Sequence, residues 1–262
     1  MTADGLGFAE AELSHDAFLG GRITLYQPKS GYRAGIDPIL LAASVPARRG
    51  ERVLDLGCGA GPALLALGAR VPGLSLTGLE RQAAYADLAV RNAGATGIAA
   101  RIFAADLREM PAELRAESFD HIIANPPYFQ AADRTAARDA GREAGRGEET
   151  PLADWVRAGS KRLAPAGRLT MIVRAERLPE LLDAMQGLLG SLEVQPLAPR
   201  TGRAARLVLV RGRKGGRAEF RLHAPIVLHE GSHHVRDGED YAPRIRAVLR
   251  EAAALHFGAS DQ

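Results

Sequence analysis

Four short apolar runs, each ending in a polar residue or a glycine, constrain the fold of this chain more than any other feature of its sequence. The runs cover residues 52–56, 74–79, 101–105 and 119–124, and helical patterns such as 83–94 separate them. Buried parallel strands have this uninterrupted apolar character because helices cover both faces of the sheet. The sequence therefore predicts an α/β, Rossmann-like doubly wound fold with a mostly parallel sheet.

Three further strands are predicted after these runs. Residues 168–173 would extend the sheet, and residues 192–197 and 205–210 would close it as a C-terminal antiparallel hairpin, which makes seven strands. Residues 220–230 are predicted as one more strand and 241–255 as a terminal helix. With 262 residues and 46% hydrophobic content, we divide the chain into a short N-terminal extension (1–45) and a main domain (46–262). In the extension, residues 20–28 alternate like a strand, and Asp37 is predicted to cap a helix.

The fourth run ends in Asn125-Pro126-Pro127-Tyr128, which predicts an active-site loop. Proline lacks a backbone N–H and restricts the residue before it, so two successive prolines permit neither a helix nor a strand ladder. The Asn125 side chain and the Pro126 carbonyl are therefore held rigidly, next to the aromatic ring of Tyr128. A bare Pro-Pro pair is more often a turn that ends a core strand. The complete motif after a strand favours a site, provided that a methyl-donor site lies upstream.

Two fixed oxygen acceptors suit methylation of a planar nitrogen. An exocyclic amine on an aromatic base, or a carboxamide nitrogen, is a poor nucleophile because its lone pair is delocalised. Acceptors for its two N–H groups draw the nitrogen toward tetrahedral geometry and direct the lone pair at an electrophile. A neighbouring aromatic ring can stack on a base taken out of its helix or loop. The motif thus predicts transfer of a methyl group to such a nitrogen.

Glycines and acids at the ends of the first three runs predict a nucleoside site. The first run leads into Asp55-x-Gly57-x-Gly59-x-Gly61, where glycines allow a ligand to approach the backbone closely. This spacing departs from the dinucleotide fingerprint Gly-x-Gly-x-x-Gly, which argues against a pyrophosphate. Glu80 is placed to accept both ribose hydroxyls of an adenosine, and Asp106 can accept its adenine amine. Each acid alone would be an ordinary strand-end carboxylate.

Together these motifs resemble those of the class I S-adenosylmethionine-dependent methyltransferases that modify amino nitrogens. The segment Gln27-Pro28-Lys29-Ser30-Gly31-Tyr32-Arg33, with Ile36-Asp37 and Leu40-Leu41, narrows the resemblance to the bacterial tRNA(Val) adenine-N6 methyltransferases. These enzymes methylate the adenine just 3′ of the anticodon. The likeness covers residues 20–255. It implies that S-adenosyl-L-methionine is the cofactor and that the partner is RNA, namely tRNA.

The resemblance also implies roles for the motif residues. Asp55, Gly57 and Gly59 would line the methionine part of the cofactor, with Glu80 at its ribose and Asp106 at its adenine. Asn125 and Pro126 would hold the target amine while Tyr128 stacks on the base. The implied cofactor-binding set is Asp55, Gly57, Gly59, Gly61, Glu80, Asp106 and Asn125, and the catalytic set is Asn125, Pro126, Pro127 and Tyr128.

Other acceptors remain open for the same motif. A protein glutamine, a guanine in ribosomal RNA and an adenine in DNA each present a planar nitrogen of the required kind. A protein that keeps the fold but only binds RNA or the cofactor is a third class. The presence of Asn125 and Glu80 argues against that last class.

Two basic stretches are candidates for contact with RNA phosphates. Residues 130–151 carry arginines at every fourth position, which would form one basic stripe if RNA made the segment helical; a mobile, solvated loop is equally compatible. Eight basic residues stand against one acid between Arg200 and Arg221, which fits phosphate contacts but also a solvated hairpin. The candidate RNA contacts are Arg134, Arg138, Arg142, Arg211, Arg213 and Lys214.

Composition sets few further limits. The 34 basic and 31 acidic residues give a net charge of +3, which by itself says little about nucleic acid. A single cysteine, Cys58, excludes an internal disulfide and fits a reducing compartment. Residues 1–20 lack the pattern of a secretion signal, and no run approaches ~18 apolar residues, so we expect a cytoplasmic protein without a membrane partner. His233-His234 lacks further ligands at metal-site spacing, so we expect a polar turn and no metal.

Overall fold

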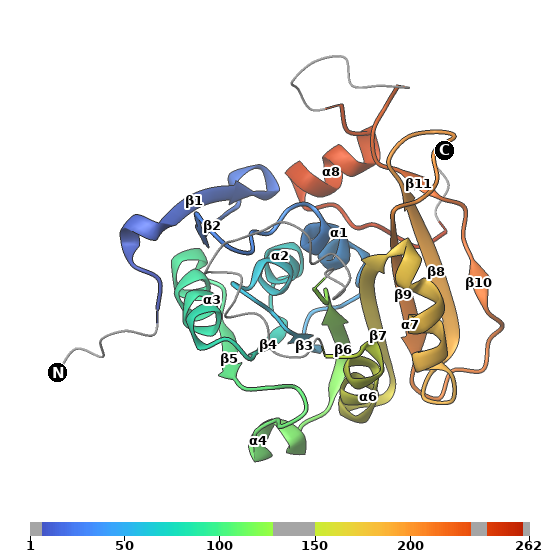
Figure 1. The fold of residues 1–262 in the computed structure, drawn as a ribbon, viewed down its shortest axis with the longest axis horizontal. Coiled ribbons are helices and arrows are strands. Elements are labelled where there is room, and N and C mark those ends of the chain that lie inside the picture. The colour runs from blue at the N-terminus through green and yellow to red at the C-terminus, as the bar shows by residue number, and fades with distance from the viewer. Residues whose placement is uncertain (1–6, 128–149, 232–239, 259–262) are drawn as a thin grey trace, which may run out of the picture.

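The four predicted runs lie side by side as the parallel centre of one sheet. The computed structural model describes residues 7–127, 150–231 and 240–258. The runs form β3 (Arg52–Leu56), β4 (Ser75–Glu80), β5 (Ala100–Ala104) and β6 (Phe119–Ala124), in the order β5-β4-β3-β6 (Figure 1). All three pairings are parallel. The predicted doubly wound α/β fold is confirmed.

An antiparallel pair completes the sheet beyond β7 (Leu163–Arg174), which lies parallel to β6. β9 (Leu207–Arg213) lies between β7 and β8 (Gly190–Ala198) and is antiparallel to both. The single strand predicted for residues 220–230 is two strands of two residues each, β10 (Arg221–Leu222) and β11 (Ile226–Val227), both parallel to β8. Pro225 has no N–H for a ladder and separates them.

Alternate residues of the central strands point into two separate cores. Val53 and Ile123 belong to one buried cluster, whereas Leu54 and Ile122 belong to the other, as the period of two in a strand requires. The first face is covered by α1 (Asp37–Ser44), α2 (Pro62–Arg70), α3 (Ala83–Thr96) and α8 (Pro243–Glu251). The second face is covered by α4 (Ala112–Ala116), α6 (Leu152–Arg162) and α7 (Leu178–Met185).

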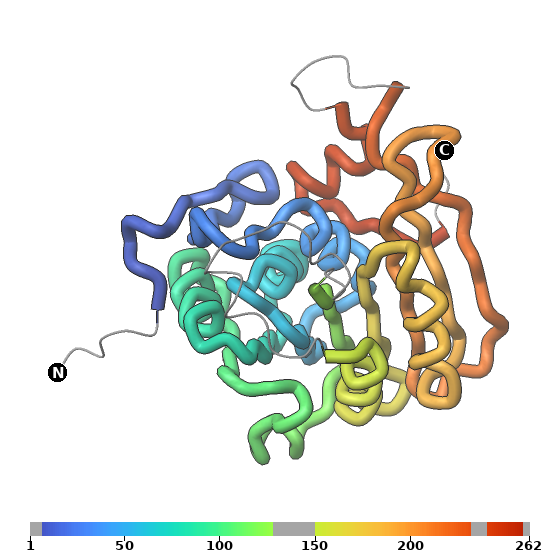
Figure 2. The backbone as a smooth tube through the Cα atoms, viewed as in Figure 1, coloured from blue at the N-terminus to red at the C-terminus, as the bar shows by residue number. Residues whose placement is uncertain are grey.

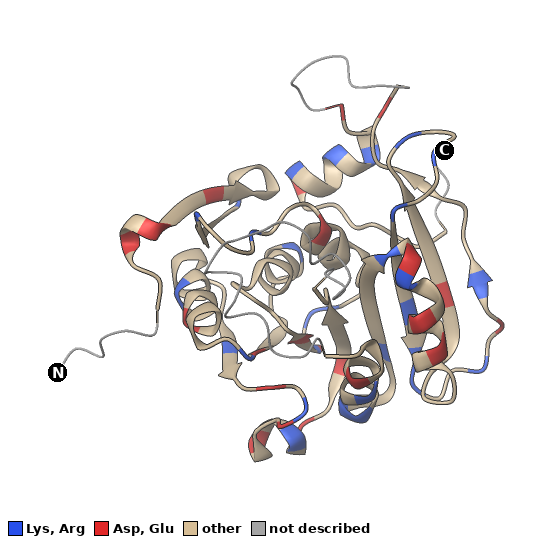
Figure 3. Cartoon of the chain, in the orientation of Figure 1, with Lys and Arg blue, Asp and Glu red and all other residues tan. Residues whose placement is uncertain are grey.

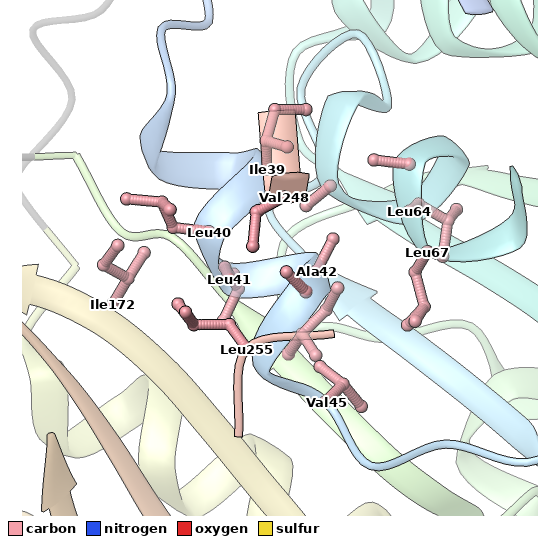
Figure 4. Packing of buried hydrophobic residues seen from close by; sticks show 14 of the residues in the cluster. Ile39, Leu40, Leu41, Ala42, Val45, Leu64, Leu67, Ile172, Val248 and Leu255 are labelled. Carbon is pink, nitrogen blue, oxygen red and sulfur yellow. The ribbon is translucent and has the colours of Figure 1, made fainter. Parts of the chain in front are cut away.

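Helix α1 lies at the centre of the first core. Figure 4 shows Leu40 and Leu41 between side chains of α2, α8, β7 and the segment around Leu255. Both leucines are fully buried, which contributes about 2 kcal/mol each. The helix begins at Asp37 itself, with Ile36 in the cap position, so the prediction that Asp37 is the cap residue is wrong. An acid in the first turn is still favourable because it faces the positive end of the helix dipole.

The N-terminal extension is an antiparallel hairpin of β1 (Leu13–Phe18) and β2 (Ile23–Pro28). β2 is the predicted strand, whereas β1 was not predicted. The turn between them contacts α8, so blue and red segments lie together in Figure 2. Gly20 has φ +66°, and a Cβ there would lie 2.5 Å from the Arg250 carbonyl oxygen, so this contact requires glycine. The division at residue 45 stays a prediction.

Candidate active site

Two of the predicted acids are buried at the carboxyl edge of the sheet. Asp55 is the fourth residue of β3 and Glu80 is the last residue of β4; their exposed fractions are 2% and 7%. The Gly59 N–H donates to Oε2 of Glu80 over 3.0 Å, and the Gln82 N–H donates to Oε1 over 2.8 Å. Asp55 Oδ2 has no hydrogen-bond partner among the described residues. An unpaired buried oxygen costs roughly 1–3 kcal/mol, which a ligand with a donor would offset.

The two acids also oppose each other electrostatically. Burial raises the pKa of Asp55 well above its usual range, and the neighbouring charge of Glu80 raises this pKa further. Burial likewise raises the pKa of Glu80, although the two backbone donors lower it in part. Paired acids of this kind are favoured where a ligand supplies hydroxyl or cationic groups. The pair therefore fits the ribose and the positively charged part of a nucleoside cofactor.

The three predicted glycines all adopt left-handed backbone conformations. Gly57, Gly59 and Gly61 have φ of +65°, +54° and +86°. A Cβ on Gly57 would lie 2.5 Å from the ring of Trp155, whereas a Cβ on Gly59 would have no atom within 4 Å apart from those of its chain neighbours. The loop is thus packed against α6 at Gly57 and open at Gly59, where a ligand can approach the backbone. Trp155 was predicted only as a helix residue, because no local pattern reports a contact over about 100 positions.

Asn92 of α3 holds this loop from the other side. The side chain is fully buried, and Nδ2 donates to the carbonyl oxygens of Ala60 over 2.9 Å and of Tyr26 over 3.1 Å. Oδ1 accepts from the Tyr26 N–H over 2.8 Å. One carboxamide thereby joins the glycine loop to the N-terminal hairpin.

Asp106 differs from the other two acids because it already has a strong partner. Its Oδ1 accepts from the backbone N–H and from Nε of Arg108 over 2.8 and 3.1 Å, and its Oδ2 accepts from Nη2 over 3.1 Å. These bonds to Arg108 lower the pKa of Asp106. The adenine contact of this residue stays a prediction.

The proline corner follows β6 at the same edge as Asp55 and Glu80. Asp55 pairs with Ile123 two positions before Asn125. Asn125 is half-buried, Pro126 is buried and Pro127 is exposed, so the corner reaches the protein surface. Asn125 Nδ2 donates to the hydroxyl of Tyr32 over 3.3 Å. Tyr128 lies outside the described residues.

The profile of the methyltransferase small domain family matches residues 34–196, which span the glycine loop, both acids and the proline corner. The chain belongs to this family. It is a class I S-adenosylmethionine-dependent methyltransferase, and S-adenosylmethionine is its cofactor. The buried acid pair and the open backbone at Gly59 fit this group, as described above.

The methyltransferase is also homologous to proteins named tRNA1(Val) (adenine(37)-N6)-methyltransferase. The protein of Dickeya chrysanthemi is 30% identical over 225 residues, which cover 84% of this chain and 87% of that relative. The protein of Porphyromonas gingivalis (strain ATCC 33277) is 32% identical over 179 residues, which cover 63% and 68% of the two chains. The predicted resemblance is confirmed at the level of family.

Two solved structures share the fold of this methyltransferase. A predicted O-methyltransferase from Agrobacterium tumefaciens aligns with a TM-score of 0.67 and 28% identity, over 84% of this chain and 98% of that chain. The T. thermophilus 16S rRNA N2 G1207 methyltransferase, solved with AdoMet and guanosine, aligns with a TM-score of 0.53 and 21% identity, over 77% and 50%. The second likeness supports the fold alone.

The basic run 200–221 is divided between the two edges of the methyltransferase sheet. Leu207 pairs with Arg174 at the end of β7, so the loop that carries Arg203 and Arg206 lies at the carboxyl edge, where both side chains are exposed. Arg213 pairs with Arg168 near the other end. The downstream part of the run therefore lies at the edge opposite the proline corner.

The three candidates of this run, Arg211 within β9 and Arg213 and Lys214 toward the amino edge, make contacts within the protein. Arg211 is 11% exposed in its side chain, lies 3.8 Å from Glu193 and donates to the Ser44 carbonyl oxygen over 3.3 Å. Lys214 donates to the Leu163 carbonyl oxygen over 2.8 Å, and Arg213 donates to that of Ala166 over 3.3 Å. This geometry argues against contact of Arg211, Arg213 and Lys214 with a substrate at the carboxyl edge. The other candidates, Arg134, Arg138 and Arg142, lie outside the described residues.

Neither a metal site nor a membrane span is found in the part of the chain that the structure describes. Its His, Cys, Asp and Glu side chains form no group of three or more placed to hold an ion. His233 and His234 lie outside that part. No described helix has both the length and the apolar character needed to cross a bilayer.

Proposed function

We propose that this methyltransferase transfers a methyl group from S-adenosylmethionine to the exocyclic N6 amine of adenine in tRNA, next to the anticodon. The observation that carries the proposal is the position of Asn125-Pro126 at the end of β6, on the edge where Asp55 and Glu80 are buried. The similarity to relatives named for that reaction, over 84% of this chain, supports the choice of acceptor.

The cofactor would be held by the glycine loop and the acid pair. S-adenosylmethionine supplies a methyl group that is electrophilic because it is bonded to a positively charged sulfur. Glu80, held by the Gly59 and Gln82 N–H groups, would accept ribose hydroxyls with its remaining lone pairs. Asp55 Oδ2 would gain a donor, and the cationic end of the cofactor would favour release of the Asp55 proton, so that the two opposite charges attract each other.

The target amine would be held by two oxygens of the corner. Oδ1 of Asn125 and the carbonyl of Pro126 would each accept one N–H of the amine, so that the nitrogen lone pair points away from both. The nitrogen becomes cationic on methylation and then loses a proton readily, so no strong base is required. Tyr128 would stack on the base, and the second proline, Pro127, would keep the backbone of the corner extended.

The exposed arginines of the β8–β9 loop would contact RNA phosphates. Arg203 and Arg206 are exposed at the carboxyl edge, and such contacts supply affinity without sequence choice. Arg203 and Arg206 are thus added to the candidate RNA contacts, and Arg134, Arg138 and Arg142, which lie outside the described residues, stay predictions from the sequence. A cytoplasmic location would follow from a tRNA substrate.

Labelling would identify the acceptor and the atom together. The protein is incubated with S-adenosylmethionine labelled in its methyl group and, separately, with total tRNA, ribosomal RNA, DNA or ribosomal protein; each product is digested to nucleosides or amino acids. We expect label in N6-methyladenosine from tRNA. Label in a guanosine, in DNA, in glutamine or on an oxygen atom would reassign the acceptor. Cofactor binding without label in any acceptor would favour a non-catalytic protein.

A further inference from the structure

The hydroxyl of Tyr32 reaches the predicted catalytic amide from a distant part of the chain. Tyr32 follows β2, whereas Asn125 follows β6, 93 positions later, and Nδ2 of Asn125 donates to the Tyr32 hydroxyl over 3.3 Å. Tyr32 is 48% exposed as a residue, so it lies at the protein surface. It therefore lies between the N-terminal hairpin and the proline corner.

The backbone of Tyr32 is fixed by a second tyrosine. The Tyr85 hydroxyl accepts from the Tyr32 N–H over 3.1 Å and donates to the Tyr32 carbonyl oxygen over 3.2 Å. Tyr85 lies on α3 and is 8% exposed. Gly31 has φ +104°, and a Cβ there would lie 3.1 Å from the Tyr85 hydroxyl. Tyr85 and Gly31 together allow little movement of Tyr32.

The chain on both sides of Tyr32 is anchored to β1. Gln27, which is 4% exposed, accepts from the Ala34 N–H over 2.7 Å and donates to Asp16 over 2.6 Å. Arg33 donates to the same carboxylate of Asp16 over 2.7 Å. The loop that carries Tyr32 is thus closed by side-chain bonds at both ends, which favours a single position of the hydroxyl.

The Tyr32 hydroxyl is held in its neutral form by its surroundings. Burial, together with the nearby carboxylates of Asp37 and Asp55, raises the pKa of Tyr32 to about 12. The phenol therefore stays neutral at physiological pH and does not act as a base. The hydroxyl oxygen of the neutral phenol accepts the Asn125 amide N–H through a lone pair.

We propose that Tyr32 is a positioning residue that selects the orientation of the Asn125 carboxamide. The two orientations of an asparagine amide differ by a half-turn about the last torsion and are similar in energy without a specific partner. When Nδ2 donates to the Tyr32 hydroxyl, Oδ1 points in the other direction. It can then accept a hydrogen bond from the amine that is to be methylated. The other orientation would present N–H groups to the N–H groups of the amine.

This inference rests on the proposed methylation of a planar amine, and a double-mutant cycle tests it. Tyr32→Phe removes only the hydroxyl, so we expect turnover at saturating S-adenosylmethionine to fall about tenfold, with cofactor affinity and melting temperature nearly unchanged. In the Asn125→Ala background the same change should have no further effect, because the amide that Tyr32 orients is gone.

Tyr26→Phe is the matched control. Its ring lies beneath the guanidinium of Arg91 and beside the ring of His15, and the change keeps its backbone bonds to Asn92, so this variant should keep full turnover. Full turnover in Tyr32→Phe, or an equal loss with and without Asn125, would overturn the inference. The cycle is run with whichever acceptor the labelling identifies. A different acceptor would therefore reject the proposed substrate while still testing Tyr32.

Discussion

The two edges of the sheet bury charged and polar groups in opposite ways. At the amino edge His121 has a complementary partner, since its Nε2 lies 3.0 Å from Glu51, although its Nδ1 has no hydrogen-bond partner among the described residues. At the carboxyl edge Asp55 and Glu80 are neighbours of like charge, and one oxygen of Asp55 has no partner among the described residues. Figure 3 shows basic residues on β9 and β10 and along α8.

This contrast distinguishes groups that stabilise the fold from groups whose burial is unfavourable until a ligand binds to them. A complementary pair offsets much of the cost of removing charges from water, whereas a like-charge pair adds to that cost. Buried acids that destabilise the protein without a ligand are typical of binding sites. Substitutions at the amino edge should therefore change stability, and substitutions at the carboxyl edge should change function.

The largest effect is expected at the proline corner. Asn125→Ala should lower turnover by roughly 10²-fold, because one of the two acceptors for the amine is removed. Cofactor affinity, measured by calorimetry, and the melting temperature should remain near those of the wild type. Full turnover in this variant would show that the corner does not position the amine.

The amino edge should give the reverse result. His121 is 2% exposed, so His121→Ala should lower the free energy of unfolding by about 2 kcal/mol, because it removes a hydrogen bond and leaves a small cavity. Turnover per folded molecule should not change. Chemical denaturation and single-turnover assays on the same sample measure both, and a selective loss of turnover would remove the distinction between the edges.

The pH dependence of His121 sharpens this prediction. Burial lowers the pKa of His121 below its usual 6.5. The unfolded chain then binds a proton more readily than the folded one, so wild-type stability should fall as pH drops below about 6.5. In His121→Ala this part of the slope should be absent. If the free energy of unfolding of His121→Ala fell with pH as in the wild type, the titrating group would be a residue other than His121.

Asp55→Asn should produce a smaller change and one of opposite sign. Because the folded pKa of Asp55 is raised, the folded state holds a proton that the unfolded state releases above about pH 4, and stability is lost as pH rises. The variant removes this loss. We expect it to be more stable than the wild type by about 1 kcal/mol at neutral pH, with the difference vanishing near pH 4.

Calorimetry with S-adenosylmethionine completes the test of Asp55. Cofactor binding should weaken in Asp55→Asn, since asparagine cannot release a proton to become negatively charged beside the cationic end of the cofactor. If the variant were less stable than the wild type at neutral pH and bound the cofactor normally, the acid pair would be structural.

The smallest effect is expected for the surface arginines. The logarithm of the binding constant for tRNA falls linearly with the logarithm of the salt concentration, and the slope counts the released counterions. Replacing Arg203 and Arg206 with alanine should lower this salt slope by about one for each phosphate that an arginine no longer neutralises. Arg213→Ala, at the other edge, is the matched control and should leave the slope unchanged. A changed slope in Arg213→Ala alone would place RNA at the amino edge.

The sequence predicts those features that are encoded locally. The apolar runs of β3, β4 and β6 are visible because these parallel strands are buried on both faces, whereas β5 at the edge is only partly buried. The glycines at 57, 59 and 61 do adopt the backbone conformations that favour glycine. β1 was missed because only Leu13 of its six residues is buried, which leaves too weak a pattern. It is a strand because β2 pairs with it.

The remaining features depend on contacts between distant segments. The basic run 200–221 is continuous in sequence, but β9 runs antiparallel through the sheet and carries its two halves to opposite edges. Similarly, no spacing rule connects Tyr32 with Asn125 or Trp155 with Gly57. These contacts follow from the strand order, which becomes known only with the three-dimensional structure.

The carboxamide of Asn92 has a consequence for how this protein handles its ligands. Because it bonds to Tyr26 and to Ala60 at once, neither segment can loosen without releasing the other. If a bound cofactor stabilises the Ala60 segment, it also favours the Asn92 bonds that hold the strand leading to Tyr32, and by thermodynamic reciprocity an acceptor that stabilises this strand would then strengthen cofactor binding by the same factor. Binding of the cofactor would then favour binding of the acceptor, and binding of the acceptor would favour binding of the cofactor.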